Sequence, residues 1–406
     1  MITVVRPRAS PEPEARNSQQ VRRLNLHRML TAAMEKTEPF TRAEIVQVTS
    51  LSVPTVGTLS EALLKAGLLR DVGVGPSRGG RRPSFLEFDS RCGFVVGVAL
   101  GATHTHVAVS DLRGDRLGHR MMATPLVGPR GLLGRIAAAV RDVLREAGVP
   151  RDKVLAAAIG VPGAVDREQG TVVALTPNLK GWVNVAVAEA LGQSLPTTWI
   201  VENDVNLAVL GERWRGAAQG HDTCAFIHAG TGIGAGIVVD GHLHRGQQFQ
   251  AGEIGLMCMG RQYLPMDFGS RGCLESLAGA AALQSRWSSS KDHGRHGLTE
   301  ILAAAEAGQP RARRLVGEAA ALIGMAAAHL ALVLDPSLIV LGGALAHSSS
   351  FLDEVRKVVG RIIPKPPDLV VSQLGREAAL WGCLAVAVTE ARSQLRERLG
   401  ARPPLP

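Results

Sequence analysis

The sequence predicts an α/β protein in which a small N-terminal unit of helices and a β-hairpin precedes a larger two-lobed α/β domain. Capped helical patterns fill residues 21–70, and a hairpin pattern follows at 68–88. Beyond residue 93, buried-strand patterns alternate with Ala- and Leu-rich helical patterns, which is typical of parallel or mixed sheets with helices on both faces. Glycine-rich turns at Gly101 and Gly230 follow strand patterns in the two halves and indicate a duplicated lobe plan.

Composition agrees with a globular protein of several folding units. The 406 residues exceed one small domain, and with only 3% aromatic residues the core must consist mainly of Ala, Val, Leu and Ile. Five scattered cysteines favour a reducing cytoplasm. We expect a cytoplasmic protein with no membrane partner, because no secretory signal is visible and no apolar run reaches roughly 18 residues. The net charge of +9 permits nucleic-acid binding without requiring it.

A disordered arm followed by two helices is expected at the start of the sequence. Residues 1–20 are rich in Pro, Glu, Ser and Arg without apolar periodicity, so we expect a disordered arm. A first helix is expected where apolar residues recur with helical spacing between Leu26 and Met34. A second should begin after Thr41, whose side chain can form a capping box with Glu44.

A third helix is expected after Ser52, a favourable N-cap, with Pro54 in the first turn, where no intrahelical donor is lost. Its apolar side chains would form one inward face. Small or polar side chains would form the outer face: Thr55, Thr58, Ser60 and Lys65. Such a face can enter a DNA major groove with little steric conflict.

The hairpin pattern has strands at 68–70 and 85–88. Three arginines lie on its glycine-rich tip: Arg78, Arg81 and Arg82. Guanidinium groups on a slim loop suit phosphates or a narrow minor groove.

The first 90 residues resemble the winged helix-turn-helix of regulators in the ROK family (repressors, open reading frames and sugar kinases). The matching phrases are TRAEI at 41–45, TSLS at 49–52 and GGRRP at 79–83, although Ser50 replaces the family's turn glycine. The resemblance implies that residues 21–90 bind a double-stranded DNA operator as a homodimer or homotetramer. A helical oligomerisation module is the alternative. The DNA-contacting residues would be Arg42, Ser52, Pro54, Thr55, Thr58, Arg78, Arg81 and Arg82.

Residues 91–400 resemble the ROK sugar-kinase domain, an actin-like ATPase fold. The resemblance implies one lobe over approximately 91–205 plus the C-terminal helix, and a second over 206–380. Ala99 stands where the family's kinases carry the Asp that helps to hold the magnesium of ATP, so we expect neither catalysis nor bound ATP. Asp204 would then be a vestigial general base.

The resemblance also implies a sugar site between the lobes. Carboxylates and amides there could accept or share hydroxyl hydrogen bonds. An Asn-Asp pair on its own, however, more often caps a helix. The expected ligand-binding residues are Gly163, Asn178, Asn203, Asp204, Glu253 and Glu275.

The segment 252–275 keeps the frame of the family's zinc loop but not its ligands. At the four ligand positions stand Leu256, Met266, Phe268 and Cys273, and Cys258 is the one further thiol nearby. Zinc requires four N, S or O donors in a structural site. We therefore expect no metal, and we expect the three apolar side chains to be buried together as a plug.

The resemblance implies a repressor of carbohydrate-related genes, controlled by a sugar or sugar phosphate in a catalytically degenerate kinase domain. Two alternatives remain open. One is a bifunctional regulator that retains ATP-dependent sugar kinase activity. The other is a regulator of the same type with no sugar ligand.

Overall fold

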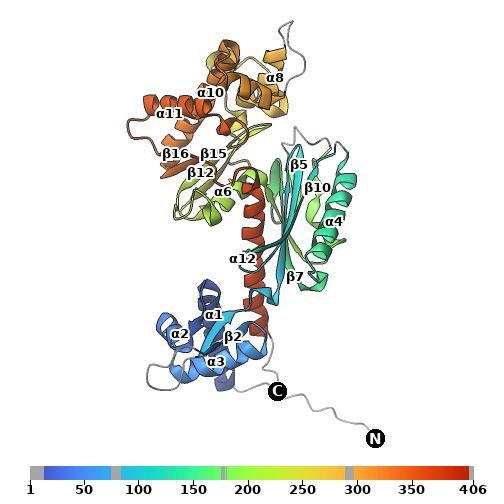
Figure 1. Ribbon diagram of the computed structural model, residues 1–406, viewed down its shortest axis with the longest axis vertical. Helices are drawn as coiled ribbons and strands as arrows, with labels where there is room; N and C mark the ends of the chain where they lie inside the picture. Colours follow the sequence, from blue (N-terminus) through green and yellow to red (C-terminus); the bar gives the residue numbers. More distant parts are fainter. Residues whose placement is uncertain are drawn as a thin grey trace. The chain divides into compact units, whose positions relative to one another are not determined.

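The structure is a computed structural model that describes residues 13–74, 84–125, 127–174, 179, 181–288 and 297–401 (Figure 1). The chain forms two compact units. The larger comprises Val95–Ser110 and Arg116–Val388. The smaller comprises Met1–Phe94, Asp111–Asp115 and Thr389–Pro406. The N-terminal unit thus includes two segments from far along the chain that local sequence patterns do not indicate.

The smaller unit contains three helices and a three-stranded antiparallel sheet in the order β1-β3-β2. Its elements are α1 (Pro13–Glu35), β1 (Phe40–Thr41), α2 (Arg42–Thr49), α3 (Val53–Lys65), β2 (Leu69–Val74) and β3 (Ser84–Phe88). The helices and hairpin confirm the expected winged helix-turn-helix architecture, whereas β1, only two residues long, was not expected. The helix α1 begins earlier than expected, so residues 13–20 are helical rather than a disordered arm. Glu, Ala, Arg and Gln are good helix formers, and Pro is favoured at a helix start.

Local capping fixes the two helices of the turn. Thr41 accepts a hydrogen bond from the Glu44 amide while the Glu44 carboxylate accepts one from the Thr41 amide, which confirms the capping box. Ser52 caps α3 through the amide of Thr55. Between them, Ser50 has a φ of 57°, the left-handed conformation that glycine would adopt more easily.

The inserted segments are fastened to the smaller unit by polar contacts. Arg113 donates to the carbonyl oxygens of Lys36 and Thr37 at 2.9 and 3.0 Å. Arg392, near the end of the last helix, donates to the carbonyl oxygen of Leu112 at 3.0 Å.

The larger unit contains two five-stranded sheets with the same order. The first sheet, β11-β7-β4-β5-β6, comprises β4 (Phe94–Leu100), β5 (His104–Asp111), β6 (Arg116–Ala123), β7 (Val154–Val161) and β11 (Thr198–Asn203). The second, β14-β13-β12-β15-β16, comprises β12 (Cys224–Ala229), β13 (Ile233–Val239), β14 (His242–Leu243), β15 (Leu338–Gly342) and β16 (Asp368–Val371). In each, an antiparallel stretch leads into parallel strands, which confirms the duplicated two-lobed α/β plan.

Helices and short elements complete the unit. The helices are α4 (Pro129–Glu146), α5 (Val187–Gly192), α6 (Asp204–Arg215), α7 (Cys273–Ala278), α8 (Ala280–Ser288), α9 (Leu298–Glu306), α10 (Pro310–Leu334), α11 (Ser349–Ile362) and α12 (Ala378–Ala401). The residues of α12 from Thr389 onward belong to the smaller unit. A small antiparallel sheet contains β8 (Ala164–Asp166), β9 (Thr171–Ala174) and β10 (Val185–Ala186). Its 3-10 turns are η2 (Arg151–Lys153), η3 (Ile254–Leu256), η4 (Arg261–Tyr263), η5 (Gly269–Arg271), η6 (Leu345–His347) and η7 (Gly375–Glu377), while η1 (Ser90–Cys92) belongs to the smaller unit.

The core uses small side chains to bring helices close together, as the composition predicts. In the second lobe α10 packs on α11, and a Cβ at Gly324 would lie 2.8 Å from the Cβ of Val358. Within the described residues, α10 is also the one helix long and apolar enough to cross a membrane, but 56% of its apolar stretch is buried. Such burial is typical of a core helix in a globular fold.

Candidate functional site

The helix α6 carries the Asn-Asp pair and lies against both sheets of the larger unit. At Gly160 of β7 a Cβ would lie 2.9 Å from the Leu207 side chain, and at Gly236 of β13 it would lie 2.5 Å from the Val205 carbonyl oxygen. The backbone contact at Gly236 requires glycine, whereas the Leu207 side chain could shift to relieve the contact at Gly160. The two contacts place the N-terminal half of α6 against β7 of the first sheet and β13 of the second.

Asn203 is held as a helix cap. Its Oδ1 accepts from the amides of Val205 and Asn206 at 2.9 and 3.0 Å. Its Nδ2 donates to the carbonyl oxygen of Gly163 at 3.0 Å, where the backbone has a φ of 104°. The structure thus brings together two expected ligand residues, Asn203 and Gly163. The hydrogen bonds of Asn203, however, serve mostly to position α6 and the turn after β7.

Glu202 is a buried residue of this site that the sequence reasoning missed. Its side chain is 4% exposed and accepts from Arg245 Nε at 2.6 Å and from Asn206 Nδ2 at 3.0 Å. A buried charge needs a partner. In the sequence, a glutamate at the end of an otherwise apolar strand was a signal for a buried polar site. Its partner Arg245 could not be inferred from local patterns, because it lies 43 residues away.

Asp204, Glu253 and Glu275 form a group of three carboxylates, which we call the carboxylate site. Burial raises the pKa of Asp204 to about 6. Burial, together with the negative charges of Asp204 and Glu275, raises the pKa of Glu253 to about 7. Burial also raises the pKa of Glu275, although the hydrogen bond from the Ile233 amide and the charge of Arg271 oppose this shift. Because the pKa values of Asp204 and Glu253 are about 6 and about 7, these two acids can donate as well as accept hydrogen bonds near neutral pH.

Backbone packing places these acids. A Cβ at Gly252 would lie 1.9 Å from the carbonyl oxygen of Ala235, so the residue before Glu253 must be glycine. Glu275 accepts from the Ile233 amide at 2.9 Å through one oxygen. Its other oxygen, Oε1, is buried and has no hydrogen-bond partner among the described residues. That oxygen could accept a hydrogen bond from a ligand.

A half-buried imidazole lies beside the glycine-rich turn after β12. A Cβ at Gly230 would lie 2.9 Å from His228 Nε2. Burial lowers the pKa of His228 to about 4, so the ring is neutral. An open cavity of about 260 Å³ lies beside this turn, lined by Thr231, Arg271, Glu275, Ser276, Gly279, Ala281, Ala282, Ser285 and Arg286.

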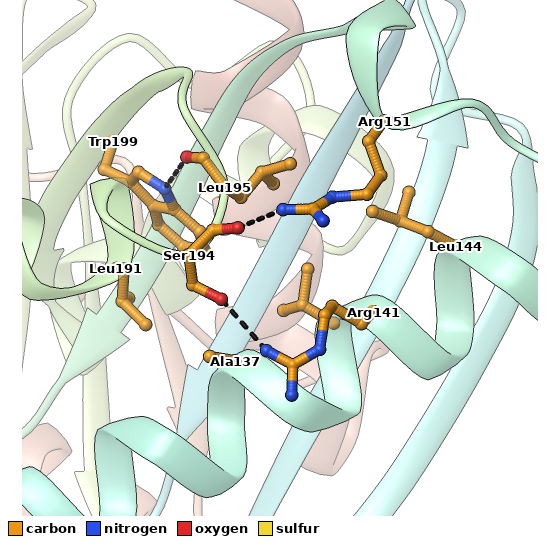
Figure 2. Close-up of a pocket in the computed structure, with 9 residues that line it drawn as sticks. Ala137, Arg141, Leu144, Arg151, Leu191, Ser194, Leu195 and Trp199 are labelled. Carbon is orange, nitrogen blue, oxygen red and sulfur yellow. Dashed lines mark hydrogen bonds between the residues drawn. The ribbon is translucent and has the colours of Figure 1, made fainter.

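A second depression, on the outer side of the first lobe, contains none of the expected ligand residues. Figure 2 shows that Arg141 and Arg151 both donate to Ser194, while the Trp199 indole donates to the carbonyl oxygen of Leu195. It has no room for a water molecule, so it is a packing defect rather than a binding site.

The segment 252–275 does not form the expected apolar plug. Leu256 is 39% exposed and Met266 is 55% exposed, while Phe268 packs edge-on against Tyr263. Leu256 and Met266 lie outside the core that Ile254, Met259 and Leu274 fill, whereas Phe268 is half-buried and packs against that core.

The residues at the family's zinc positions do not fit the metal. Cys273 is buried and accepts a hydrogen bond from the Met259 amide. Cys258 is exposed and donates to the carbonyl oxygen of Gly260. The four positions supply one thiol and three side chains without an adequate donor. At the position of the kinases' magnesium ligand, Ala99 is 6% exposed on β4 and offers no carboxylate.

The expected DNA-contacting residues that the structure describes lie on α2 and α3. Arg42 forms an exposed ion pair with Glu61 at 2.7 Å. Ser52, Pro54 and Thr58 are exposed, and the Thr58 hydroxyl donates to the Pro54 carbonyl oxygen. Ser60, however, is buried and donates to the Val56 carbonyl oxygen, so it does not belong to the outer face. Four expected site residues lie outside the described part of the chain: Arg78, Arg81, Arg82 and Asn178.

Comparison with known proteins agrees with this architecture. The chain is 29% identical over 368 residues to the xylose repressor of Caldicellulosiruptor bescii, covering 86% of the chain and 92% of the repressor. It is 31% identical to a ROK family glucokinase from Streptomyces griseus, solved with glucose and AMPPNP, with a TM-score of 0.64 and coverage of 73% and 100%. A solved ROK family transcriptional regulator, a homologue of the E. coli MLC protein, shares the fold at a TM-score of 0.77, 22% identity and coverage of 94% and 99%. The model of the ROK family matches residues 95–390, and the chain therefore belongs to the ROK family.

Proposed function

We propose that this chain is a cytoplasmic, sugar-responsive transcriptional repressor of carbohydrate-related genes. The observation that carries the proposal is the extent of similarity. The match to the xylose repressor covers 86% of the chain, whereas the match to the glucokinase covers 73%. The additional part of the chain includes the winged helix-turn-helix.

The DNA-binding role rests on the smaller unit. The helix α3 presents exposed Ser52, Pro54 and Thr58 at its N-terminal end, where short side chains can approach base edges. A homodimer or homotetramer would place two such units on half-sites related by the two-fold symmetry of the protein. The wing arginines would add phosphate or minor-groove contacts.

Selection of bound DNA from genomic fragments tests this role. The full-length protein should enrich a small set of fragments that contain paired half-sites. Binding of the Arg81→Ala/Arg82→Ala double variant should be weaker and depend less steeply on salt, because fewer phosphate counterions are released. No enrichment over random fragments would overturn the DNA-binding role. An unchanged salt slope would overturn only the contribution of the wing.

The effector role rests on the carboxylate site. Asp204, Glu253 and Glu275 provide acceptors for sugar hydroxyls, and Glu275 has a buried oxygen available for a ligand. Binding would control DNA affinity only if the sugar, or sugar phosphate, binds the DNA-free and DNA-bound states unequally. If no sugar changes the melting temperature of the protein, the alternative of a regulator with no sugar ligand is favoured instead.

A retained sugar kinase activity is the second candidate, and two observations favour it. Asp204 keeps the general-base position with a pKa raised to about 6, closer to neutrality, and the glycine-rich turn after β12 is intact. Ala99 opposes it, because a hydrocarbon cannot bind magnesium. Sugar-dependent ATP consumption that disappears in Asp204→Asn would establish the kinase. We expect no such consumption, and therefore no role for ATP as a cofactor.

A further inference from the structure

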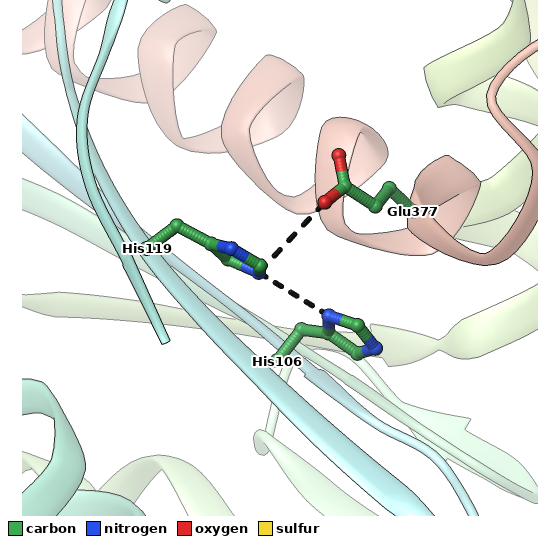
Figure 3. A group of neighbouring side chains, drawn as sticks. All are labelled: His106, His119 and Glu377. Carbon is green, nitrogen blue, oxygen red and sulfur yellow. Dashed lines mark hydrogen bonds and ion pairs between the residues drawn. The ribbon is translucent and has the colours of Figure 1, made fainter. Parts of the chain in front are cut away.

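Two histidines and a glutamate from three separate segments meet on the first sheet of the larger unit. His106 lies on β5, His119 lies on β6, and Glu377 lies in η7, just before α12. In the register of the two strands, His119 is opposite Ala108 and His106 is opposite Met121. The histidines are therefore diagonal neighbours on one face of the sheet. Figure 3 shows a ring nitrogen of each histidine facing the other, with the Glu377 carboxylate approaching His119.

The spacing of the three donor atoms suits a metal ion. His106 Nδ1 and His119 Nε2 are 3.3 Å apart, and His119 Nε2 is 3.8 Å from Glu377 Oε1. All three atoms lie within 4.8 Å of one another. Donors about 2.0 to 2.2 Å from a tetrahedral zinc ion lie roughly 3.3 to 3.5 Å from each other. Small side-chain rotations would bring the donor atoms that are farther apart to these distances.

The ring geometry leaves both nitrogens directed at the shared space. The ring centroids are 5.5 Å apart and the planes differ by 15°. With the nitrogens only 3.3 Å apart, these values mean that the rings face each other edge to edge. In this arrangement the two nitrogens share a proton, and rotation of both rings would turn the same nitrogens toward a common metal ion beside the line that joins them.

The surroundings orient the carboxylate and keep the imidazoles neutral. Arg116 donates to the other oxygen of Glu377 at 2.9 Å and lies over the Trp381 ring, so Oε1 is turned toward His119. Burial lowers the pKa of both histidines. Repulsion by His119, His104 and Arg376 lowers the pKa of His106 further, and Arg116 does the same for His119, while Glu377 opposes both shifts. Neutral imidazole is the form that binds metals.

We propose that His106, His119 and Glu377 bind one divalent transition-metal ion, with zinc as the best fit and a water molecule in the fourth position. The site is distinct from the eroded loop at 252–275, and it revises the expectation that the chain binds no metal. The bound ion would join β5, β6 and η7, and it would stabilise the start of α12 against the sheet. The inference does not depend on the proposed function.

Zinc titration of the full-length protein tests the site. After treatment with EDTA, the wild type should bind one Zn²⁺ per chain in competition with a chromophoric chelator, and its melting temperature should rise. His119→Ala should weaken binding about tenfold or more. His104→Ala and Cys258→Ser should leave binding unchanged, because His104 lies outside the triad and Cys258 belongs to the eroded loop.

Cobalt provides a second measurement. Co²⁺ in this site should give the visible absorption of a four-coordinate ion without the charge-transfer band of a thiolate, and Glu377→Gln should alter it. If His119→Ala does not fold, as judged by circular dichroism, Glu377→Gln still tests the zinc affinity. Equal zinc binding by wild type and the folded triad variants, or no saturable binding by wild type, would overturn the proposal.

Discussion

Replacing Glu253 with Gln should change how the stability of the protein depends on pH. The substitution keeps the size of the side chain and removes a charge that faces Asp204 and Glu275. In the folded protein the pKa of Glu253 is about 7, compared with 4.5 for the group in an unfolded chain. The folded state therefore holds the proton more tightly than the unfolded state does.

The sign of the effect follows from this difference. Below pH 4.5 both states are protonated and Glu253 behaves much like Gln. As the pH rises from 4.5 to 7, the folded state retains a proton that the unfolded state has lost, so stability falls and then becomes constant. A shift of this size corresponds to about 3 kcal/mol at most. Because the site is partly exposed, solvent screening reduces the expected change in the free energy of unfolding to about 1–2 kcal/mol.

Thermal unfolding at several pH values measures this contribution. At about 2 °C per kcal/mol for a unit of this size, the melting temperature of Glu253→Gln should exceed that of wild type by about 2–4 °C at pH 8 and by almost nothing at pH 4.5. In Glu253→Gln the melting temperature should still fall as the pH rises, but less steeply than in wild type, because Asp204 and Glu275 also have raised pKa values. Glu168→Gln, at an exposed position, is the matched control. Parallel pH profiles for wild type and Glu253→Gln would refute the raised pKa of Glu253.

Two other substitutions test the local geometry. Asn203→Ala should lower the free energy of unfolding by about 2–3 kcal/mol in denaturant titrations, since it removes the cap of α6 and leaves the Gly163 carbonyl oxygen without its donor; a loss below 0.5 kcal/mol would contradict the capping role. Ser50→Gly should raise the stability of the smaller unit by up to about 1 kcal/mol, because the left-handed backbone at Ser50 costs less for glycine; a decrease would show that contacts of the serine side chain outweigh the strain.

The sequence predicted best those features that depend on nearby residues. The caps at Thr41 and Ser52 lie within three residues of their partners, and the capped helices begin where they were expected. The two-lobed plan was also predictable, because strand patterns with glycine turns recur in both halves. The start of α1 was not predictable, because polar residues can be either helical or disordered and no local signal separates the two states.

Features that depend on distant contacts could not be predicted in the same way. The partnership of Glu202 with Arg245 spans 43 residues, and the triad of His106, His119 and Glu377 is assembled by strand register and by the start of α12. The prediction of an apolar plug was wrong for a related reason. Hydrophobicity at Leu256 and Met266 favoured burial, but the core positions beneath them were already filled by other parts of the chain.

The most direct test of the account is the effect of sugars on binding to the selected operator. Fluorescence anisotropy with labelled operator DNA should show that one sugar or sugar phosphate releases wild-type protein. Glu253→Ala should bind the same operator with unchanged affinity but no longer respond, while Glu168→Ala should respond like wild type. Release of the Glu253→Ala variant at the same sugar concentration as wild type would contradict the carboxylate site as the place where the effector binds.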